Sequence, residues 1–151
     1  MERFDTSLTM MLYRALDALM PRFRAIFREF DLTEQQWRIL RVLWDGDELS
    51  AIELADRTLI PAPSLVGILN RLERRQLVKR LRNKRDRRSV IVAITRDGRK
   101  LKESVAPRVE QVYQQMQASI APDVWDQLHT GLSCVCQIDA PDGALDKDAN
   151  E

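Results

Sequence analysis

A long stripe of apolar residues opens the chain. Its members recur at steps of three or four: Leu8, Leu12, Ala15, Leu19, Phe23, Ile26 and Phe30. This spacing places them on one face of an α-helix and predicts a helix over about 8–30. Pro21 lies inside the stripe, and because proline removes a backbone hydrogen bond, we expect the helix to kink or restart there.

Two helix-start signals follow in tandem. Segments 33–36 and 50–53 each place Thr or Ser three residues before Gln or Glu, which is the pattern of a capping box. The first signal predicts a helix that runs to about Trp44 and stops at an Asp-Gly-Asp turn. The second predicts a short helix through about Thr58.

The pattern then changes from helical to extended. A fourth helix is predicted over about 61–75, with two prolines in its first turn. Segments 77–81 and 89–94 are rich in β-forming residues, and the segment 82–88 between them is entirely polar. This arrangement predicts a hairpin with a basic tip.

The last part of the chain is again helical. A second long stripe runs from Leu101 to Ile120 and is interrupted by Pro107, and a final helix is predicted from Pro122 to about Gln137. The fold class is therefore mainly α with a small β-hairpin (α+β).

Length and composition fit one soluble globular domain. The 151 residues are 44% hydrophobic and 31% charged. Glu2 stands where a signal peptide carries basic residues, and no run approaches the roughly 18 apolar residues of a membrane span. We expect a cytoplasmic protein without a membrane partner.

The residues needed for an enzyme or a metal site are scarce. The two cysteines, Cys134 and Cys136, are too few for a disulfide framework or a zinc site, and there is a single histidine. We interpret the two cysteines as reduced helix residues, with a redox-sensing thiol as the alternative. Without a glycine-rich phosphate loop or a nucleophile paired with a base, we expect no enzymatic activity, no metal and no cofactor.

The net charge of +1 hides a strongly polar distribution. Between Arg71 and Lys102 there are 14 Lys or Arg against 3 Asp or Glu, so this block carries a local charge of +11. A basic block in a nearly neutral chain indicates a face that binds a polyanion. The alternative is an ordinary solvated surface, which usually mixes both signs.

Two short helices followed by a basic hairpin form a helix-turn-helix with a wing. The second helix of such a pair enters the DNA major groove. Its predicted outward residues are Ser64, Gly67, Asn70, Arg71 and Arg74. Asn can bridge an adenine edge and Arg a guanine edge, although Asn70 and Arg71 are also common as solvated helix residues.

The hairpin tip adds a second candidate surface. Its cations, Lys84, Arg85, Arg87 and Arg88, suit a narrow minor groove. Asp86 stands among them and can orient an arginine by pairing with it. On the strand that leads to the tip, Lys79, Arg80 and Arg82 are predicted to contact DNA phosphates.

These motifs resemble the MarR family of transcriptional regulators. The resemblance rests on segments 32–40, 63–74, 86–88 and 94–98, and it extends from about Leu8 to Gln137. Within the family these segments look most like the repressors of homoprotocatechuate degradation operons. The resemblance implies a homodimer whose first, fifth and sixth helices interlock, bound to a pseudo-palindromic DNA operator. It also implies a wing pair between Asp86 and Arg88.

The resemblance fixes the expected domain organisation. We expect a single winged helix-turn-helix domain over 1–137, with a DNA-binding lobe over about 33–98. Dimerisation helices are expected over about 5–30 and 99–137. The segment 138–151 is mostly acidic and is predicted to be disordered.

Members of the family are commonly released from DNA by phenolic or aromatic carboxylates. Arg38 beside Trp37 could bind a carboxylate while the indole stacks on an aromatic ring, and Arg14 is a further candidate. Alternatively, Arg38 pairs with an acid at the dimer interface. The expected function is repression of an aromatic-compound catabolic operon. A regulator without an effector and a weakly specific architectural DNA-binding protein remain alternatives.

Overall fold

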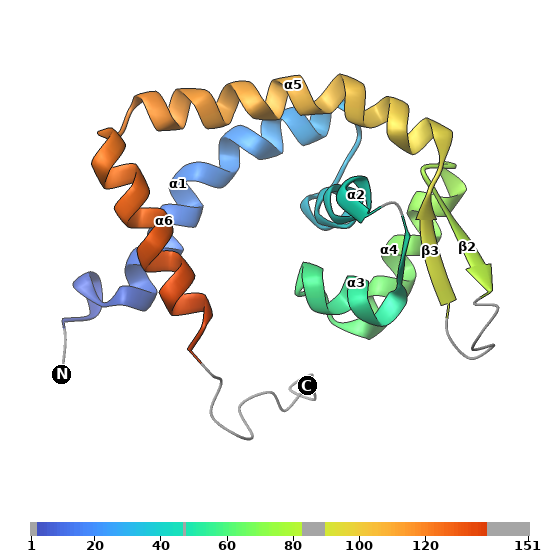
Figure 1. Ribbon diagram of the computed structural model, residues 1–151, viewed down its shortest axis with the longest axis horizontal. Coiled ribbons are helices and arrows are strands. Elements are labelled where there is room, and N and C mark those ends of the chain that lie inside the picture. The colour runs from blue at the N-terminus through green and yellow to red at the C-terminus, as the bar shows by residue number, and fades with distance from the viewer. Residues whose placement is uncertain (1–2, 47, 83–89, 139–151) are drawn as a thin grey trace. The chain divides into compact units, whose positions relative to one another are not determined.

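The computed structural model describes residues 3–46, 48–82 and 90–138 (Figure 1). Its elements are η1 (Phe4–Thr6), α1 (Leu8–Glu29), α2 (Glu34–Gly46), β1 (Glu48–Ser50), α3 (Ala51–Thr58), α4 (Ala62–Arg74), β2 (Val78–Arg82), β3 (Val90–Ile94), α5 (Arg96–Ala118) and α6 (Pro122–Cys136). The chain divides into two compact units, Met1–Val109 and Glu110–Glu151, so the division falls within α5.

Capping boxes begin both helices for which the sequence predicts them. Before α2, the Thr33 N–H donates to Gln36 Oε1 at 2.9 Å and the Gln36 N–H donates to Thr33 Oγ1 at 3.2 Å. Before α3, Ser50 and Glu53 exchange the equivalent bonds at 2.8 and 3.2 Å. Hydrogen bonds from the Ser50 side chain and backbone N–H lower the pKa of Glu53 below its ordinary value. Both predicted helix starts are confirmed.

The sheet has one strand more than the predicted hairpin. Strands β2 and β3 pair antiparallel as expected, with Lys79 opposite Ala93. Strand β1 pairs with the other edge of β3, with Leu49 opposite Val92, and makes a three-stranded sheet in the order β1-β3-β2. A strand of three residues is too short to show an alternating pattern, so the sequence carries no local signal for it.

Both long helices continue through their prolines. Pro21 lies inside α1 and Pro107 inside α5, and each helix is a single element. The single long first helix predicted over about 8–30 is therefore confirmed, without a restart at Pro21, and Pro107 does not interrupt α5. Pro21 is exposed, so water can bond the carbonyl that loses its partner there.

The core of the first unit holds the helix-turn-helix and the sheet together. The side chains of Ile39, Leu40, Leu43, Leu54, Leu72 and Val92 have no measurable exposure. Trp44 extends this core toward α5, where its indole Nε1–H donates to the Gly98 carbonyl at 2.9 Å. Helix α4 and the sheet are therefore held in place by the same hydrophobic core.

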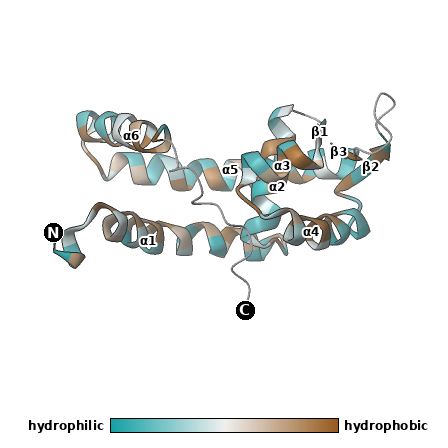
Figure 2. Cartoon of the chain, turned by 90° about the horizontal axis from the view of Figure 1, so that it is seen from below, coloured by the Kyte–Doolittle hydropathy of each residue, from teal (hydrophilic) through white to brown (hydrophobic). Residues whose placement is uncertain are grey.

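The second unit contains the end of α5 and all of α6. None of the 15 residues of α6, each of which the structure describes, is buried. Yet its exposed residues include Val124, Leu128 and Leu132, which follow each other at steps of four. Figure 2 shows hydrophobic and hydrophilic residues along α6. Cys134 and Cys136 are exposed on the same helix and form no disulfide. In the described part of the chain, no helix combines the length and apolar character needed to cross a bilayer.

Candidate nucleic-acid interface

Helix α4 separates a buried face from an exposed one. Leu65, Ile68, Leu69 and Leu72 are buried. Five residues are predicted to face outward. Four of them, Ser64, Gly67, Arg71 and Arg74, are exposed, and the fifth, Asn70, is half-buried at the edge between the two faces. Val66 is 56% exposed on the same helix. The sequence did not predict this exposure, because an apolar residue in an amphipathic helix is expected to be buried.

A tight connection joins α3 to α4. Leu59 ends α3 in the left-handed conformation at φ 53°, and its N–H donates back into the last turn of the helix. Arg38 reaches this end of α3 from α2, with its Nη1 donating to the Thr58 carbonyl at 2.9 Å. A cation at the carboxyl end of a helix is favourably placed. Arg38 therefore links α2 to the carboxyl end of α3.

Arg80 links the sheet to α4. Its Nη2 donates to Asn70 Oδ1 at 2.6 Å and to the Val66 carbonyl at 3.3 Å. Its Nε lies 3.8 Å from Glu73 Oε2, and its backbone N–H donates to Glu73 Oε1 at 3.3 Å. The side chain that was predicted to contact phosphate instead faces α4. Arg82, two residues along β2, is exposed.

A basic depression adjoins the carboxyl end of α4. It has a volume of about 450 Å³ and is lined by Arg28, Asp31, Leu32, Thr33, Gln36, Arg71, Arg74 and Arg75. Arg75 donates to the carbonyls of Phe30, at 3.0 Å, and Asp31, and so ties α4 to the turn after α1. Sequence reasoning missed Arg75, since a helix-end arginine gives no sign of the carbonyls it will reach.

The predicted tip residues lie outside the described residues. Lys84, Arg85, Asp86, Arg87 and Arg88 all fall in segment 83–89, so the proposed Asp86–Arg88 pair stays a prediction. The strands on either side of this segment are described and paired to each other. The tip therefore follows directly from β2, the strand that packs against α4 through Arg80.

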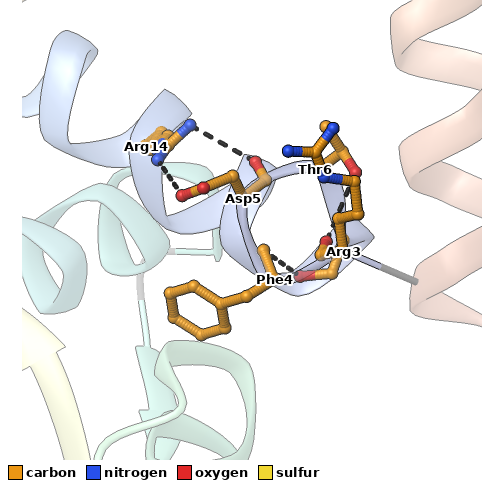
Figure 3. Close-up of polar contacts among 6 residues, drawn as sticks. Arg3, Phe4, Asp5, Thr6 and Arg14 are labelled. Carbon is orange, nitrogen blue, oxygen red and sulfur yellow. Dashed lines mark hydrogen bonds and ion pairs between the residues drawn. The ribbon is translucent and has the colours of Figure 1, made fainter. Parts of the chain in front are cut away.

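The three candidate ligand residues have different surroundings. Arg14 pairs with Asp5 at 2.8 Å near the start of the chain (Figure 3). Trp37 is half-buried, stacked on Phe27 with ring centroids 4.9 Å apart, and meets the edge of Trp44 at 5.3 Å. Arg38 faces α3, and its Nε is buried with no hydrogen-bond partner among the described residues.

Comparison with known proteins gives the family. The MarR family profile matches residues 30–89. The homoprotocatechuate degradative operon repressor of Escherichia coli is 39% identical over 122 residues, which cover 81% of this chain and 82% of that repressor. The chain belongs to the MarR family. As a MarR-family protein it is a transcriptional regulator, and the resemblance seen in its sequence is confirmed.

Solved structures confirm the MarR-type winged-helix fold. NadR in complex with 4-hydroxyphenylacetate is 34% identical, with 92% of this chain and 99% of that one covered and a TM-score of 0.80. BpsR of Bordetella bronchiseptica, whose DNA binding is regulated by 6-hydroxynicotinic acid, is 27% identical, with coverage of 92% and 99% and a TM-score of 0.83. The predicted fold class is therefore correct, with β1 added to the hairpin.

Proposed function

We propose that this MarR-family regulator binds duplex DNA in a sequence-specific way, with α4 in the major groove. The observation that carries the proposal is the exposed polar face of α4, which lies beside the basic strand β2 on a buried core. A major groove is wide enough to admit such a helix. Ser64, Gly67, Asn70, Arg71 and Arg74 supply its contacts. Lys84, Arg85, Asp86, Arg87 and Arg88 form the wing contact.

The regulator acts as a homodimer. Support comes from apolar residues that stay exposed on two helices: Leu8, Met11 and Leu16 on α1, and Val124, Leu128 and Leu132 on α6. Exposed apolar residues that gather on one helix are typical of a protein–protein interface, so we expect a second copy of the chain to cover them. Two-fold symmetry then predicts a pseudo-palindromic operator with half-sites roughly 10 bp apart. We place the dimer in the cytoplasm.

The effector is a small phenolic or aromatic carboxylate, and the target is an aromatic-compound catabolic operon. Support comes from the relative that represses homoprotocatechuate degradation and from the structure of NadR with 4-hydroxyphenylacetate. In this chain, Trp37 offers an indole for stacking, and the unpartnered Nε of Arg38 offers a donor to a carboxylate. Arg14 is the second candidate cation, and it would have to exchange Asp5 for the effector.

A gel shift tests both parts of this proposal. The probe is the intergenic DNA beside the protein's own gene, titrated against random DNA with and without hydroxyphenylacetates, benzoates and cinnamates. We expect affinity for one fragment at least about 10³ above random DNA, and release by one class of acid. Equal affinity for all duplexes would show an architectural protein. Specific binding that no acid relieves would remove the effector and leave the DNA-binding function.

Arg88→Ala is expected to weaken binding to specific and random DNA alike. Each wing cation that neutralises a phosphate adds about one unit to the slope of log K against log salt. The slope should therefore fall by about two for a dimer, which carries two copies of the wing. Arg22→Ala, which removes an exposed arginine of α1, serves as the charge-matched control and should leave the slope unchanged. An unaltered slope in Arg88→Ala would take this residue off the DNA surface.

A further inference from the structure

The contact between Arg80 and Asn70 fixes the direction of an amide on α4. The guanidinium of Arg80 is held on several sides, by Asn70 Oδ1, the Val66 carbonyl and the Glu73 carboxylate. Its backbone is also held, because β2 is paired to β3 and the Arg80 N–H bonds Glu73. Only 28% of the Arg80 side chain is exposed, so most of this side chain is packed against its neighbours.

The chemistry of the two groups leaves one orientation of the amide. A guanidinium has five N–H donors and no acceptor, so only the oxygen of an Asn amide can face it. The contact is short at 2.6 Å and is charge-assisted, which makes it stronger than a bond between neutral groups. The amide nitrogen of Asn70 consequently turns away from Arg80, and its two N–H donors are the part left for a ligand.

This orientation changes the base that Asn70 can recognise. Reading adenine takes both halves of the amide, because the oxygen accepts from N6 while the nitrogen donates to N7. Here the bond from Arg80 takes one lone pair of the oxygen and fixes the rotation of the amide, so the oxygen faces the guanidinium and not a base edge. Guanine presents two acceptors, N7 and O6, to the major groove, and an amide that offers only donors fits that edge.

We propose that Arg80 is a positioning residue that converts Asn70 into a hydrogen-bond donor, so that α4 selects guanine at the base pair Asn70 meets. The inference rests on the proposed DNA-binding function and deepens it. It also replaces the adenine contact expected from the residue type alone. Specificity at this position is then set by a strand residue that itself touches no base.

Selection of preferred half-sites from a randomised duplex library tests the proposal. The wild-type dimer should prefer guanine at one position of each half-site, and Asn70→Ala should lose the preference at that position only. Arg80→Leu frees the amide oxygen, so the same position should shift toward adenine, with a change of about tenfold in the guanine-to-adenine ratio. Asn70→Asp presents only acceptors and should shift it toward cytosine, whose N4 donates.

Arg82→Leu is the matched control. It removes the same charge two residues along β2, from an exposed side chain, and should weaken binding without changing any base preference. The proposal is overturned if Arg80→Leu behaves like Arg82→Leu, since Arg80 would then be a phosphate contact. It is also overturned if the wild type already prefers adenine where Asn70→Ala relaxes selection.

The failure of the proposed function gives a different result. A wild-type protein that enriches no sequence would overturn both the DNA-reading role of α4 and the role of Arg80. Thermal unfolding of each variant shows whether its fold is kept. Should Arg80→Leu fail to fold, Asn70→Asp still decides, because a carboxylate oxygen can still accept from Arg80 while the N–H donors offered to DNA are lost. Guanine preference retained in Asn70→Asp would then contradict the proposal.

Discussion

Gly98→Ala should destabilise the protein by about 3 kcal/mol, at the upper end of what overpacking costs. A Cβ at this position would stand 2.3 Å from the Leu77 carbonyl oxygen and 2.6 Å from Ile94 Cδ1. The isoleucine can change rotamer, but the carbonyl belongs to the backbone just before β2. It also accepts hydrogen bonds from Thr95, so it cannot move away without breaking them.

Thermal or urea unfolding at equal protomer concentration measures the effect. For a chain of this size, 3 kcal/mol corresponds to a fall in Tm of roughly 6–12 °C. Gly67→Ala is the matched control, because its Cβ would meet nothing within 4 Å. Gly67 lies inside α4, where alanine is the better helix former, so this variant should gain up to about 1 kcal/mol. Equal stability of the two variants would show that Leu77 and Gly98 are not in close contact.

The sequence predicted those elements whose signals are local. The capping boxes at Thr33 and Ser50 lie within four residues of the helices they begin, and both are present. Strand β1 was missed because its stability comes from β3, whose partner residues lie more than 40 positions later in the chain. A three-residue segment becomes a strand only when such a distant edge is available.

The site shows the same division between local and distant information. Helical periodicity correctly placed Ser64, Gly67, Arg71 and Arg74 on the exposed side of α4. The role of Asn70 depends on Arg80, which lies ten residues away on another element. Residue type alone suggested that Asn70 contacts adenine and that Arg80 contacts phosphate. Long side chains choose partners across elements, and that choice follows from packing, which the pattern along one element does not contain.

Leu128→Glu should convert the regulator from a dimer to a monomer and abolish tight operator binding. Leu128 is 46% exposed in the middle of the apolar row of α6, which we propose is covered by the second copy. A carboxylate buried there without a partner costs several kcal/mol, enough to separate the subunits at micromolar concentration. Each lobe would then bind one half-site alone, and the affinity should fall about 10²- to 10⁴-fold.

Ser133→Glu separates the effect of position from that of charge. Ser133 is exposed on the same helix, five residues from Leu128, and a rotation of about 100° per residue puts it well away from the apolar row. It should remain dimeric in analytical ultracentrifugation and shift the operator normally, whereas Leu128→Glu should sediment as a monomer with unchanged helix content. A dimeric Leu128→Glu with full operator affinity would place the dimer interface elsewhere than on α6. A monomer that still binds the whole operator tightly would instead show that each subunit reads its site alone.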